Sequence, residues 1–324
     1  MAGLFYFAFG KKIKNLKSEV FWMGILVVGS VALDTVKTPF GKADEALGGS
    51  ATYFSTGASY FTDVRVVAVV GQDFPEKHIN FLKTKRVDLS GLSRVPGKTF
   101  RWEGFYDYDL NKAHTLRTEL NVFETFKPEL PEQYRDSEIV FLANIDPELQ
   151  KSVLGQVRKP RLVAADTMNF WIESKKPELM ETLKLVDILT INDAETRELA
   201  GEPNLVKAAR KIISMGPRTL IVKRGEYGVL MFNGGSIFSA PAYPLDAVFD
   251  PTGAGDTFAG GFMGYIASTM DWSDGNLRKA LVMGSCMASF AVEDFSLGGI
   301  SSLDYKEIEG RFREFKKLSH FEDL

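Results

Sequence analysis

Residues 250–261 read DPTGAGDTFAGG, a glycine-rich turn followed by a helix that the sequence predicts over about 256–269. Gly253 and Gly255 have no Cβ, so the backbone N–H groups of this turn can approach a ligand closely. The first turn of the helix adds unpaired N–H groups and the positive end of the helix dipole. Gly253, Ala254 and Gly255 are therefore predicted to form an anion hole for a phosphate group.

Asp256 brings a carboxylate to this anion hole, where it would repel a bound polyanion. Two interpretations remain open. As an N-cap, Asp256 would stabilise the helix by about 1 kcal/mol. As a general base, it would take the proton of a hydroxyl that attacks phosphorus, while the anion hole stabilises the transferred phosphoryl group. The second interpretation requires Asp256 to face the acceptor hydroxyl.

Outward from this turn, apolar runs alternate with segments of helical periodicity. The expected strands cover 24–33, 64–71, 138–143, 161–166, 187–191 and 219–224, and the expected helices cover 50–61, 74–85, 177–185, 194–201 and 205–215. This alternation predicts an α/β fold with right-handed crossovers and a mainly parallel sheet covered by helices on both faces. Ligands of such sheets bind beyond the carboxyl ends of the strands. Asp34 follows the first strand, so it is placed either to bind a polyol or simply to form a turn.

Two polar segments, at about 35–47 and 98–123, interrupt the alternation. They read as antiparallel hairpin pieces, which predicts a small separate sheet that forms a lid. We expect one domain over 24–324 that carries this lid.

The composition is that of a globular protein with balanced charge. Lys and Arg number 39 and Asp and Glu number 42 among 324 residues, which gives a formal net charge of -3. This balance argues against a broad nucleic-acid-binding surface. The single cysteine, Cys286, excludes an intrachain disulfide, and the three histidines lie too far apart in the sequence to suggest a zinc site. Neither a GxxxxGK[ST] loop nor a GxGxxG after the first strand is present.

Residues 1–23 begin with a short apolar run and then become basic, which is the reverse of a signal peptide. The run is also shorter than the roughly 20 residues that a membrane-spanning helix needs. We interpret 1–23 as a poorly ordered extension or a misassigned start, with a membrane-touching segment as the alternative. The protein is expected to act in the cytoplasm without a membrane partner.

The sequence DPTGAGDTFAGGF (250–262) resembles the carboxy-terminal signature of the ribokinase-like (PfkB) carbohydrate kinases. Four other segments of this chain resemble further motifs of that family and occur in the same order. They are LGGSATYFS (47–55), VVGQDF (69–74), NDAE (192–195) and VKRGEYG (222–228). The resemblance covers roughly 24–300. It implies a three-layer α/β/α domain with a β-sheet lid, and an ATP- and Mg²⁺-dependent kinase that phosphorylates a small sugar or cyclitol. A nucleoside kinase of the same family and a non-catalytic nucleotide or metabolite sensor are the alternatives.

Carried over position by position, the resemblance implies a role for each matching residue. Asp256 would be the base, and Gly253, Ala254 and Gly255 the anion hole for the γ-phosphate. The nucleotide side would comprise Asn192, Lys223, Gly225, Gly228 and Thr252, with Glu195 holding Mg²⁺ through water. The acceptor side would comprise Asp34, Gly48, Gly49 and Tyr53, with Asp166 and Asn169 close to the phosphates. Asp250 would lie at a site for a monovalent cation such as K⁺.

Tyr53 departs from the pattern of many sugar kinases of this family, which carry Asn at this position. The tyrosine is similar to the inositol-kinase-like branch, where it would stack on or wall off a ring, and it argues against ribose or fructose. The aromatic residues of the second lid segment would cover the acceptor or simply hold the lid together; they are Phe100, Trp102, Phe105, Tyr106 and Tyr108. Lids of this family often pair edge to edge, so a homodimer through the lid is an open possibility.

Overall fold

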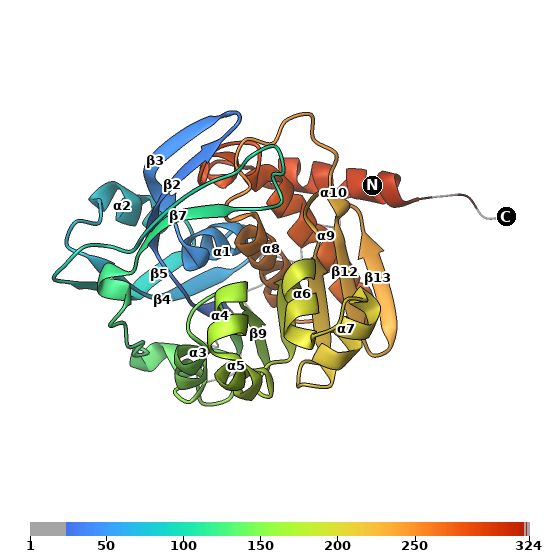
Figure 1. Ribbon diagram of the computed structural model, residues 1–324, viewed down its shortest axis with the longest axis horizontal. Coiled ribbons are helices and arrows are strands. Elements are labelled where there is room, and N and C mark those ends of the chain that lie inside the picture. Colours follow the sequence, from blue (N-terminus) through green and yellow to red (C-terminus); the bar gives the residue numbers. More distant parts are fainter. Residues whose placement is uncertain (1–23, 321, 323–324) are drawn as a thin grey trace, which may run out of the picture.

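The computed structural model describes residues 24–320 and 322, so the predicted extension at 1–23 lies outside the described residues. Its main sheet has nine strands (Figure 1). In spatial order they are β13 (Ser236–Ala240), β12 (Val229–Asn233), β11 (Thr219–Lys223), β10 (Ile188–Asn192), β9 (Leu162–Asp166), β8 (Ile139–Leu142), β1 (Gly24–Val28), β4 (Asp63–Gly71) and β5 (Val87–Val95). The seven strands from β11 to β5 are parallel, and β12 and β13 extend the sheet antiparallel.

Helices cover both faces of this sheet, because successive side chains of each strand point to opposite faces. In β1, Ile25 and Val27 join one buried core, whereas Leu26 and Val28 join the other. The first core includes side chains of α1 (Ser50–Ala58), α2 (Glu76–Thr84), α8 (Ala254–Thr269), α9 (Asp274–Ala291) and α10 (Tyr305–Ser319). The second includes side chains of α3 (Pro147–Leu154), α4 (Asn169–Ser174), α5 (Lys176–Leu183), α6 (Asp193–Ala200) and α7 (Leu205–Ile213). The predicted three-layer α/β/α architecture is confirmed.

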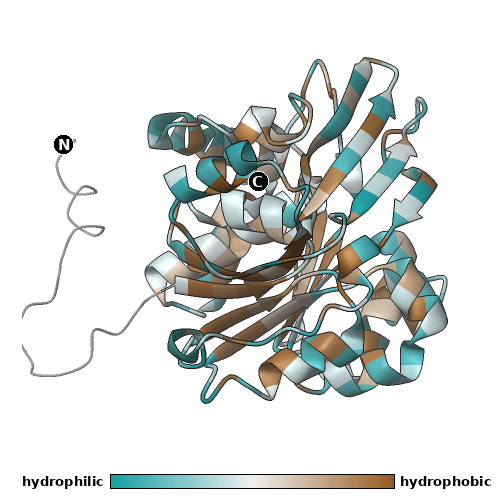
Figure 2. Ribbon diagram, turned by 90° about the vertical axis from the view of Figure 1, so that its left-hand side faces the viewer, coloured by the Kyte–Doolittle hydropathy of each residue, from teal (hydrophilic) through white to brown (hydrophobic). Residues whose placement is uncertain are grey.

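A second sheet of four strands forms the lid. In spatial order they are β3 (Gly41–Gly48), β2 (Ala32–Thr38), β6 (Arg101–Phe105) and β7 (His114–Glu119). The β2–β3 and β6–β7 pairs are antiparallel hairpins, and β2 pairs with β6 in parallel. Figure 2 shows the hydrophobic strands of the main sheet between helices, whereas the lid strands carry many hydrophilic residues. Both predicted lid segments therefore contribute to one small sheet.

Two predictions about strands need correction. The run 24–33 does not form one strand, because β1 ends at Val28 and β2 begins at Ala32 in the other sheet. At Gly29 a Cβ would lie only 2.8 Å from Ala143 Cβ and 2.9 Å from Ser50 Oγ, so the chain changes direction where α1 packs closely. The residues stay buried throughout, so hydrophobicity alone did not reveal the break. The expected strands also omit β5, an edge strand with a partly exposed, polar sequence, and the hairpin β12–β13, which extends the sheet at its other edge.

Helix α8, which begins at the signature turn, packs between two other helices. A Cβ at Gly260 would lie 2.3 Å from the carbonyl oxygen of Phe54 in α1, and one at Gly261 would lie 2.7 Å from Met287 Cγ in α9. The two glycines thus allow close helix packing, which accounts for their unfavourable presence within a helix. Close packing on both sides holds the N-terminus of α8 in place beside the sheet.

Short 3-10 helices complete the described fold: η1 (Asn121–Phe123), η2 (Glu132–Tyr134), η3 (Gly225–Tyr227) and η4 (Gly298–Ile300). Within the described residues, every helix is too short or too polar to cross a lipid bilayer.

Candidate active site

The signature turn opens directly into α8. Gly253 adopts a left-handed conformation with φ 72° and has no side chain with which to cap the helix. A Cβ at this position would lie 2.3 Å from the Tyr53 ring, so glycine is required both by the backbone angle and by the tyrosine beneath it. The first helical N–H groups, at the positive end of the dipole, are therefore not covered by a capping side chain, as an anion hole requires.

Asp256 lies in the first turn of α8 and is partly buried. Burial raises the pKa of its carboxyl to about 7, with a further contribution from the negative charge of Asp166 and opposition from Lys223. A carboxyl group with this pKa exchanges a proton readily near neutral pH, which is the property that general-base catalysis needs.

Three adjacent strands, β9, β10 and β11, end beside this turn and carry Asp166, Asn192 and Lys223 at their carboxyl ends. Lys223 Nζ donates to Asp166 Oδ2 at 2.8 Å. A Cβ added to Gly255 would lie 3.0 Å from Lys223 Nζ, so the ammonium group is next to the start of α8. Burial opposes its charge, but Asp166 and Glu195 outweigh this effect and raise the Lys223 pKa. The predicted anion hole therefore has the positively charged Lys223 side chain beside it.

Asn192 and Glu195 form a capping box at the start of α6. Asn192 Oδ1 accepts from the N–H of Glu195 at 2.8 Å, and Glu195 Oε2 accepts from the N–H of Asn192 at 2.8 Å. Burial, followed by the charge of Asp166, raises the pKa of Glu195 to about 7. The NDAE motif thus has a helix-capping role, which holds the Glu195 carboxyl facing the Asp166–Lys223 pair.

Asp34 lies on β2, the lid strand that follows β1 of the main sheet, and is 6% exposed. The β2–β3 pairing is irregular between Asp34 and Val36, and such bulges redirect side chains. A Cβ at Gly48 would lie 1.9 Å from Asp34 Oδ2, so this glycine makes room for the carboxyl. Gly49 (φ 94°) donates its N–H to Asp34, but burial dominates and raises the pKa of Asp34 to about 7, helped by Asp250 and Asp256.

Tyr53 and Tyr106 lie close to these carboxyl groups. Tyr53 is 2% exposed; burial, followed by the charges of Asp34 and Asp250, raises its pKa well above the ordinary value. The ring packs against Gly253, so Tyr53 forms a wall of the predicted anion hole. The Tyr106 hydroxyl, from the end of β6 in the lid, lies 3.4 Å from Thr252 Oγ1 in the signature turn.

The other lid aromatics hold the lid together or face solvent. Phe100 stacks on Phe123, Phe105 stacks on His114, and Tyr108 is 93% exposed. Trp102 Nε1 donates to Thr115 Oγ1 across the β6–β7 hairpin. Of these aromatic residues, Tyr106 is therefore the candidate site residue. The alternating aromatic pattern does not identify it, because the pattern does not say which side chains face the signature turn and which face solvent.

Asp250 connects the signature turn to the chain after α9. Its Oδ1 accepts from the N–H of Thr252 at 2.9 Å, and its Oδ2 accepts from the N–H of Ser296 at 3.0 Å. Asp250 is 1% exposed, and burial raises its pKa. Its carboxylate therefore shapes the backbone below the anion hole.

The remaining predicted residues are distributed differently. Gly225 (φ 55°) is the first residue of the turn η3, two positions after Lys223, and Gly228 (φ 83°) follows that turn. A Cβ at Gly228 would lie 2.2 Å from the carbonyl oxygen of Ala240, so the β12–β13 hairpin needs this glycine as well. Asn169 is exposed at the start of α4, and no contact joins its side chain to the Asp256 group within the described residues.

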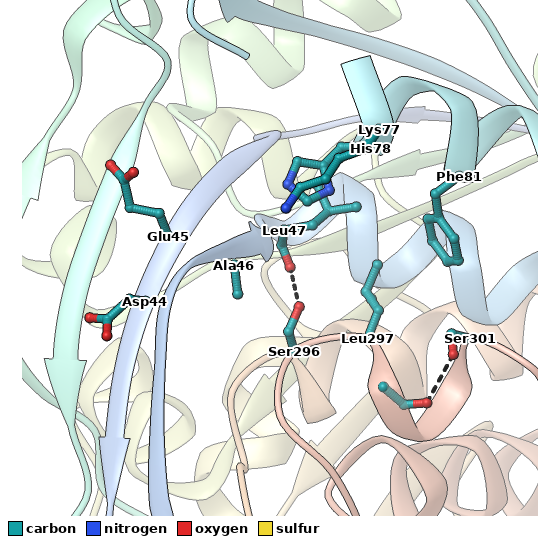
Figure 3. A pocket seen from close by; sticks show the side chains of 11 residues that line it. Asp44, Glu45, Ala46, Leu47, Lys77, His78, Phe81, Ser296, Leu297 and Ser301 are labelled. Carbon is teal, nitrogen blue, oxygen red and sulfur yellow. Dashed lines mark hydrogen bonds between the residues drawn. The ribbon is translucent and has the colours of Figure 1, made fainter. Parts of the chain in front are cut away.

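An open pocket of about 460 Å³ lies next to the lid strand β3 (Figure 3). Its walls come from Asp44–Leu47, from α2, and from residues 296–301, and it contains none of the candidate catalytic carboxyl groups. Ser296 connects the two places, because its Oγ donates to the Leu47 carbonyl at 2.6 Å while its N–H donates to Asp250. The pocket is thus a neighbour of the candidate active site.

The arrangement joins an uncapped helix N-terminus, a buried lysine, and carboxyl groups on either side. The negative charge of Asp256 acts both on Asp34 and on Lys223. Asp256 therefore lies near both Asp34 on the lid strand β2 and Lys223 at the end of β11. Such a site can bind a phosphoryl group and remove a proton from a hydroxyl group next to it.

Comparisons with known proteins agree with this chemistry. The pattern of the pfkB family carbohydrate kinases matches residues 45–302. Cytidine kinase of Thermococcus kodakarensis is 30% identical over 247 residues, which are 74% of this chain and 87% of the relative. Ribokinase of Lactococcus lactis is 26% identical over 90% of this chain and 98% of its own length.

The fold is also that of solved structures. The crystal structure of Methanocaldococcus jannaschii nucleoside kinase, an archaeal member of the ribokinase family, superposes with a TM-score of 0.72 at 22% identity. The match covers 90% of this chain and 98% of that structure. The predicted ribokinase-like fold with its lid is confirmed. The family pattern matches most of this chain, and the chain is 30% identical to a kinase over most of the length of both proteins. This chain therefore belongs to the pfkB family of carbohydrate kinases.

Proposed function

We propose that the protein transfers the γ-phosphate of ATP to a hydroxyl group of a small sugar or cyclitol. In this reaction the acceptor oxygen forms a bond to the γ-phosphorus as the bond from that phosphorus to the β-phosphate oxygen breaks. ADP leaves, and the acceptor proton passes to the Asp256 carboxylate. The backbone N–H groups of 253–256 stabilise the charge on the transferred phosphoryl group.

The observation that carries this proposal is the position and pKa of Asp256. Its carboxyl lies at the uncapped start of α8, its pKa is raised to about 7, and its charge acts on both Asp34 and Lys223. The N-cap residue of α8 is Gly253, and Asp256 lies inside the first turn, so the N-cap interpretation of Asp256 is wrong. Asp34 would bind the acceptor hydroxyls, with Gly48 and Gly49 beside it, and Tyr106 would close the lid on the signature turn.

On the nucleotide side, Lys223 would neutralise phosphate charge, and the turn from Gly225 to Gly228 would follow the nucleotide, with Asn192 and Thr252 close by. The donor set suits Mg²⁺, which keeps several waters and uses few protein oxygens. No group of three His, Cys, Asp or Glu side chains within the described residues could hold a metal ion alone. The phosphates and water would therefore supply most ligands, with Glu195 acting through water. When bound, Mg²⁺ would neutralise phosphate charge.

Two further roles rest on the resemblance. Both Asp250 oxygens already accept backbone N–H groups, so a K⁺ ion there would be held largely by backbone carbonyls around the same turn. Asp166 would act through Lys223, and Asn169 would have to approach from its exposed position on α4.

A nucleoside is the second candidate acceptor, because the relatives include a cytidine kinase and a nucleoside kinase. The buried position of Tyr53 supports neither acceptor over the other, since its ring packs on Gly253. A non-catalytic sensor is less well supported, because it would have no use for a base beside an anion hole. We further propose action in the cytoplasm, where ATP is available, and a homodimer paired through the lid edges β3 and β7.

The experiment is an assay of ADP release against panels of sugars, inositols and nucleosides, with and without K⁺. Asp256→Asn should lower kcat by about 10² or more, because the general base is lost, while ATP affinity stays within about twofold. Asp274→Asn is the matched control, since Asp274 occupies the first turn of the neighbouring helix α9.

Near-wild-type turnover of Asp256→Asn would overturn the assigned role. If the wild-type protein transfers phosphate to no compound of the panel but is stabilised by ATP in thermal unfolding, the sensor alternative is supported instead.

A further inference from the structure

The tip of the β6–β7 lid hairpin touches the turn that follows Lys223. Asn111 Nδ2 donates to Glu226 Oε1 at 3.1 Å, and Asn111 Oδ1 accepts from the backbone N–H of Glu226 at 3.3 Å. A single lid side chain thus makes two hydrogen bonds to one residue that lies 115 positions later in the chain.

Both partners are shaped for this contact. A Cβ at Gly225 would lie 1.8 Å from Asn111 Oδ1, so any other residue there would displace the asparagine. Gly225 has a left-handed φ of 55°, which directs the following N–H toward the lid. On the lid side, Asp109 Oδ1 accepts from the N–H of Asn111 at 3.2 Å and so orders the tip of the hairpin.

The same hairpin connects the acceptor side to the nucleotide side. Strand β6 pairs with β2, where Trp102 lies in register with Asp34. At its end, Tyr106 contacts Thr252 of the signature turn. Beyond that, Asn111 reaches the turn 224–228, which continues the strand that carries Lys223. One element of the lid therefore contacts three parts of the candidate site.

We propose that Asn111 is a positioning residue that makes nucleotide affinity depend on closure of the lid. The contact orders the turn 224–228 before the nucleotide arrives, so less conformational freedom is lost on binding. By linkage, the nucleotide must stabilise the closed lid by the same factor. This inference rests on the proposed function, which puts Gly225 along the nucleotide.

The test measures the Kd of the non-hydrolysable ATP analogue AMP-PNP with Mg²⁺ by titration calorimetry. We expect Asn111→Ala to raise the Kd about 3–10-fold, the effect of losing modest exposed hydrogen bonds. Asn111→Asp should raise it further, because the new carboxylate faces Glu226. Asn111→Asp with Glu226→Gln should return the Kd toward the wild-type value, because the introduced amide can donate to the introduced carboxylate. Lys112→Ala, an exposed neighbour on the same loop, should leave the Kd unchanged.

An unchanged or lower Kd for Asn111→Ala would overturn the proposal, and so would a paired variant no better than Asn111→Asp alone. If the wild-type protein does not bind AMP-PNP, the proposed function fails, and a second measurement tests the contact itself. The variant Asn111→Cys with Glu226→Cys should be joined by a short bismaleimide, because the single native thiol, Cys286, is buried. The absence of that cross-link would overturn the contact.

Discussion

At the scale of single residues, the candidate site depends on glycines that leave space for specific functional groups. Gly48 and Gly49 look alike in the sequence but differ in kind. A Cβ at Gly48 would meet the Asp34 carboxyl at 1.9 Å, whereas one at Gly49 would meet the carbonyl oxygen of Ser30 at 2.5 Å. Only Gly49 has a left-handed φ. Gly49 is therefore needed by the backbone, and Gly48 is needed by the Asp34 side chain.

Gly48→Ala should thus impair acceptor binding without loss of the fold. We expect the KM for the acceptor identified in the assay to rise about tenfold or more, with the KM for ATP within about twofold, because the displaced Asp34 side chain is the group that we propose binds the acceptor. Steady-state kinetics measures both. Gly275→Ala, where a Cβ would meet no atom within 4 Å, is the control. An unchanged acceptor KM would contradict the role of Asp34.

At the scale of secondary-structure elements, the order of the sheet brings the charged groups together. Strands β9, β10 and β11 are neighbours, and Asn192 lies in register with Lys223. Their carboxyl ends therefore meet at one edge, as expected for ligand sites of open α/β sheets. The Asp166–Lys223 pair is buried there, with side chains 6% and 19% exposed. A buried pair is costly to break because one charge is left without a partner.

Lys223→Met should lower the free energy of unfolding by about 3–5 kcal/mol, because Asp166 stays buried without its cation. Adding Asp166→Asn should restore most of that stability, while AMP-PNP affinity stays low in both variants. Urea denaturation and calorimetry provide the two readouts. Lys175→Met is the control, since Lys175 pairs with Asp146 at 2.7 Å near the surface and should cost under about 1 kcal/mol. Equal losses for Lys223→Met and Lys175→Met would contradict this argument.

At the scale of the whole molecule, the fold encloses carboxyl groups from distant parts of the chain. Asp34, Glu195 and Asp256 each have a pKa raised to about 7, chiefly by burial. Between the ordinary carboxyl pKa and about pH 7, the folded protein holds protons that the unfolded chain releases. Stability from these groups is therefore present at low pH and lost as pH rises through this window. The site is maintained at the expense of stability near neutral pH.

Asp256→Asn should consequently stabilise the protein more at pH 8 than at pH 5. We expect the Tm difference between this variant and the wild type to grow by about 1–2 °C, which corresponds to about 1 kcal/mol in a protein of this size. Thermal unfolding without nucleotide, at both pH values, measures it. Asp274→Asn, in the first turn of α9, is measured under the same conditions as the control. A difference for Asp256→Asn that does not change with pH would show that its carboxyl is not held protonated.

The class of the fold, and a chemical role for the signature turn, can be predicted from the sequence alone. Apolar runs that alternate with amphipathic segments predict the layered α/β architecture. A strand covered by helices on both sheet faces is apolar throughout, and a helix that covers a sheet is apolar on one side. The spacing of Gly253, Gly255 and Asp256 predicted the anion hole, because these residues are neighbours in the chain. Local patterns of this kind do not depend on distant partners.

The distant residues that meet around that turn can be identified only once the chain has folded. Tyr106 of the lid contacts Thr252, Asn111 contacts Glu226, and Lys223 joins Asp166 through sheet order. The break between β1 and β2 and the edge strand β5 also escaped prediction, because burial and polarity along a short segment do not specify which strand it pairs with. Hydrophobic periodicity indicates which face of a helix or strand is buried. Strand order and register, in contrast, result from the packing of the whole chain.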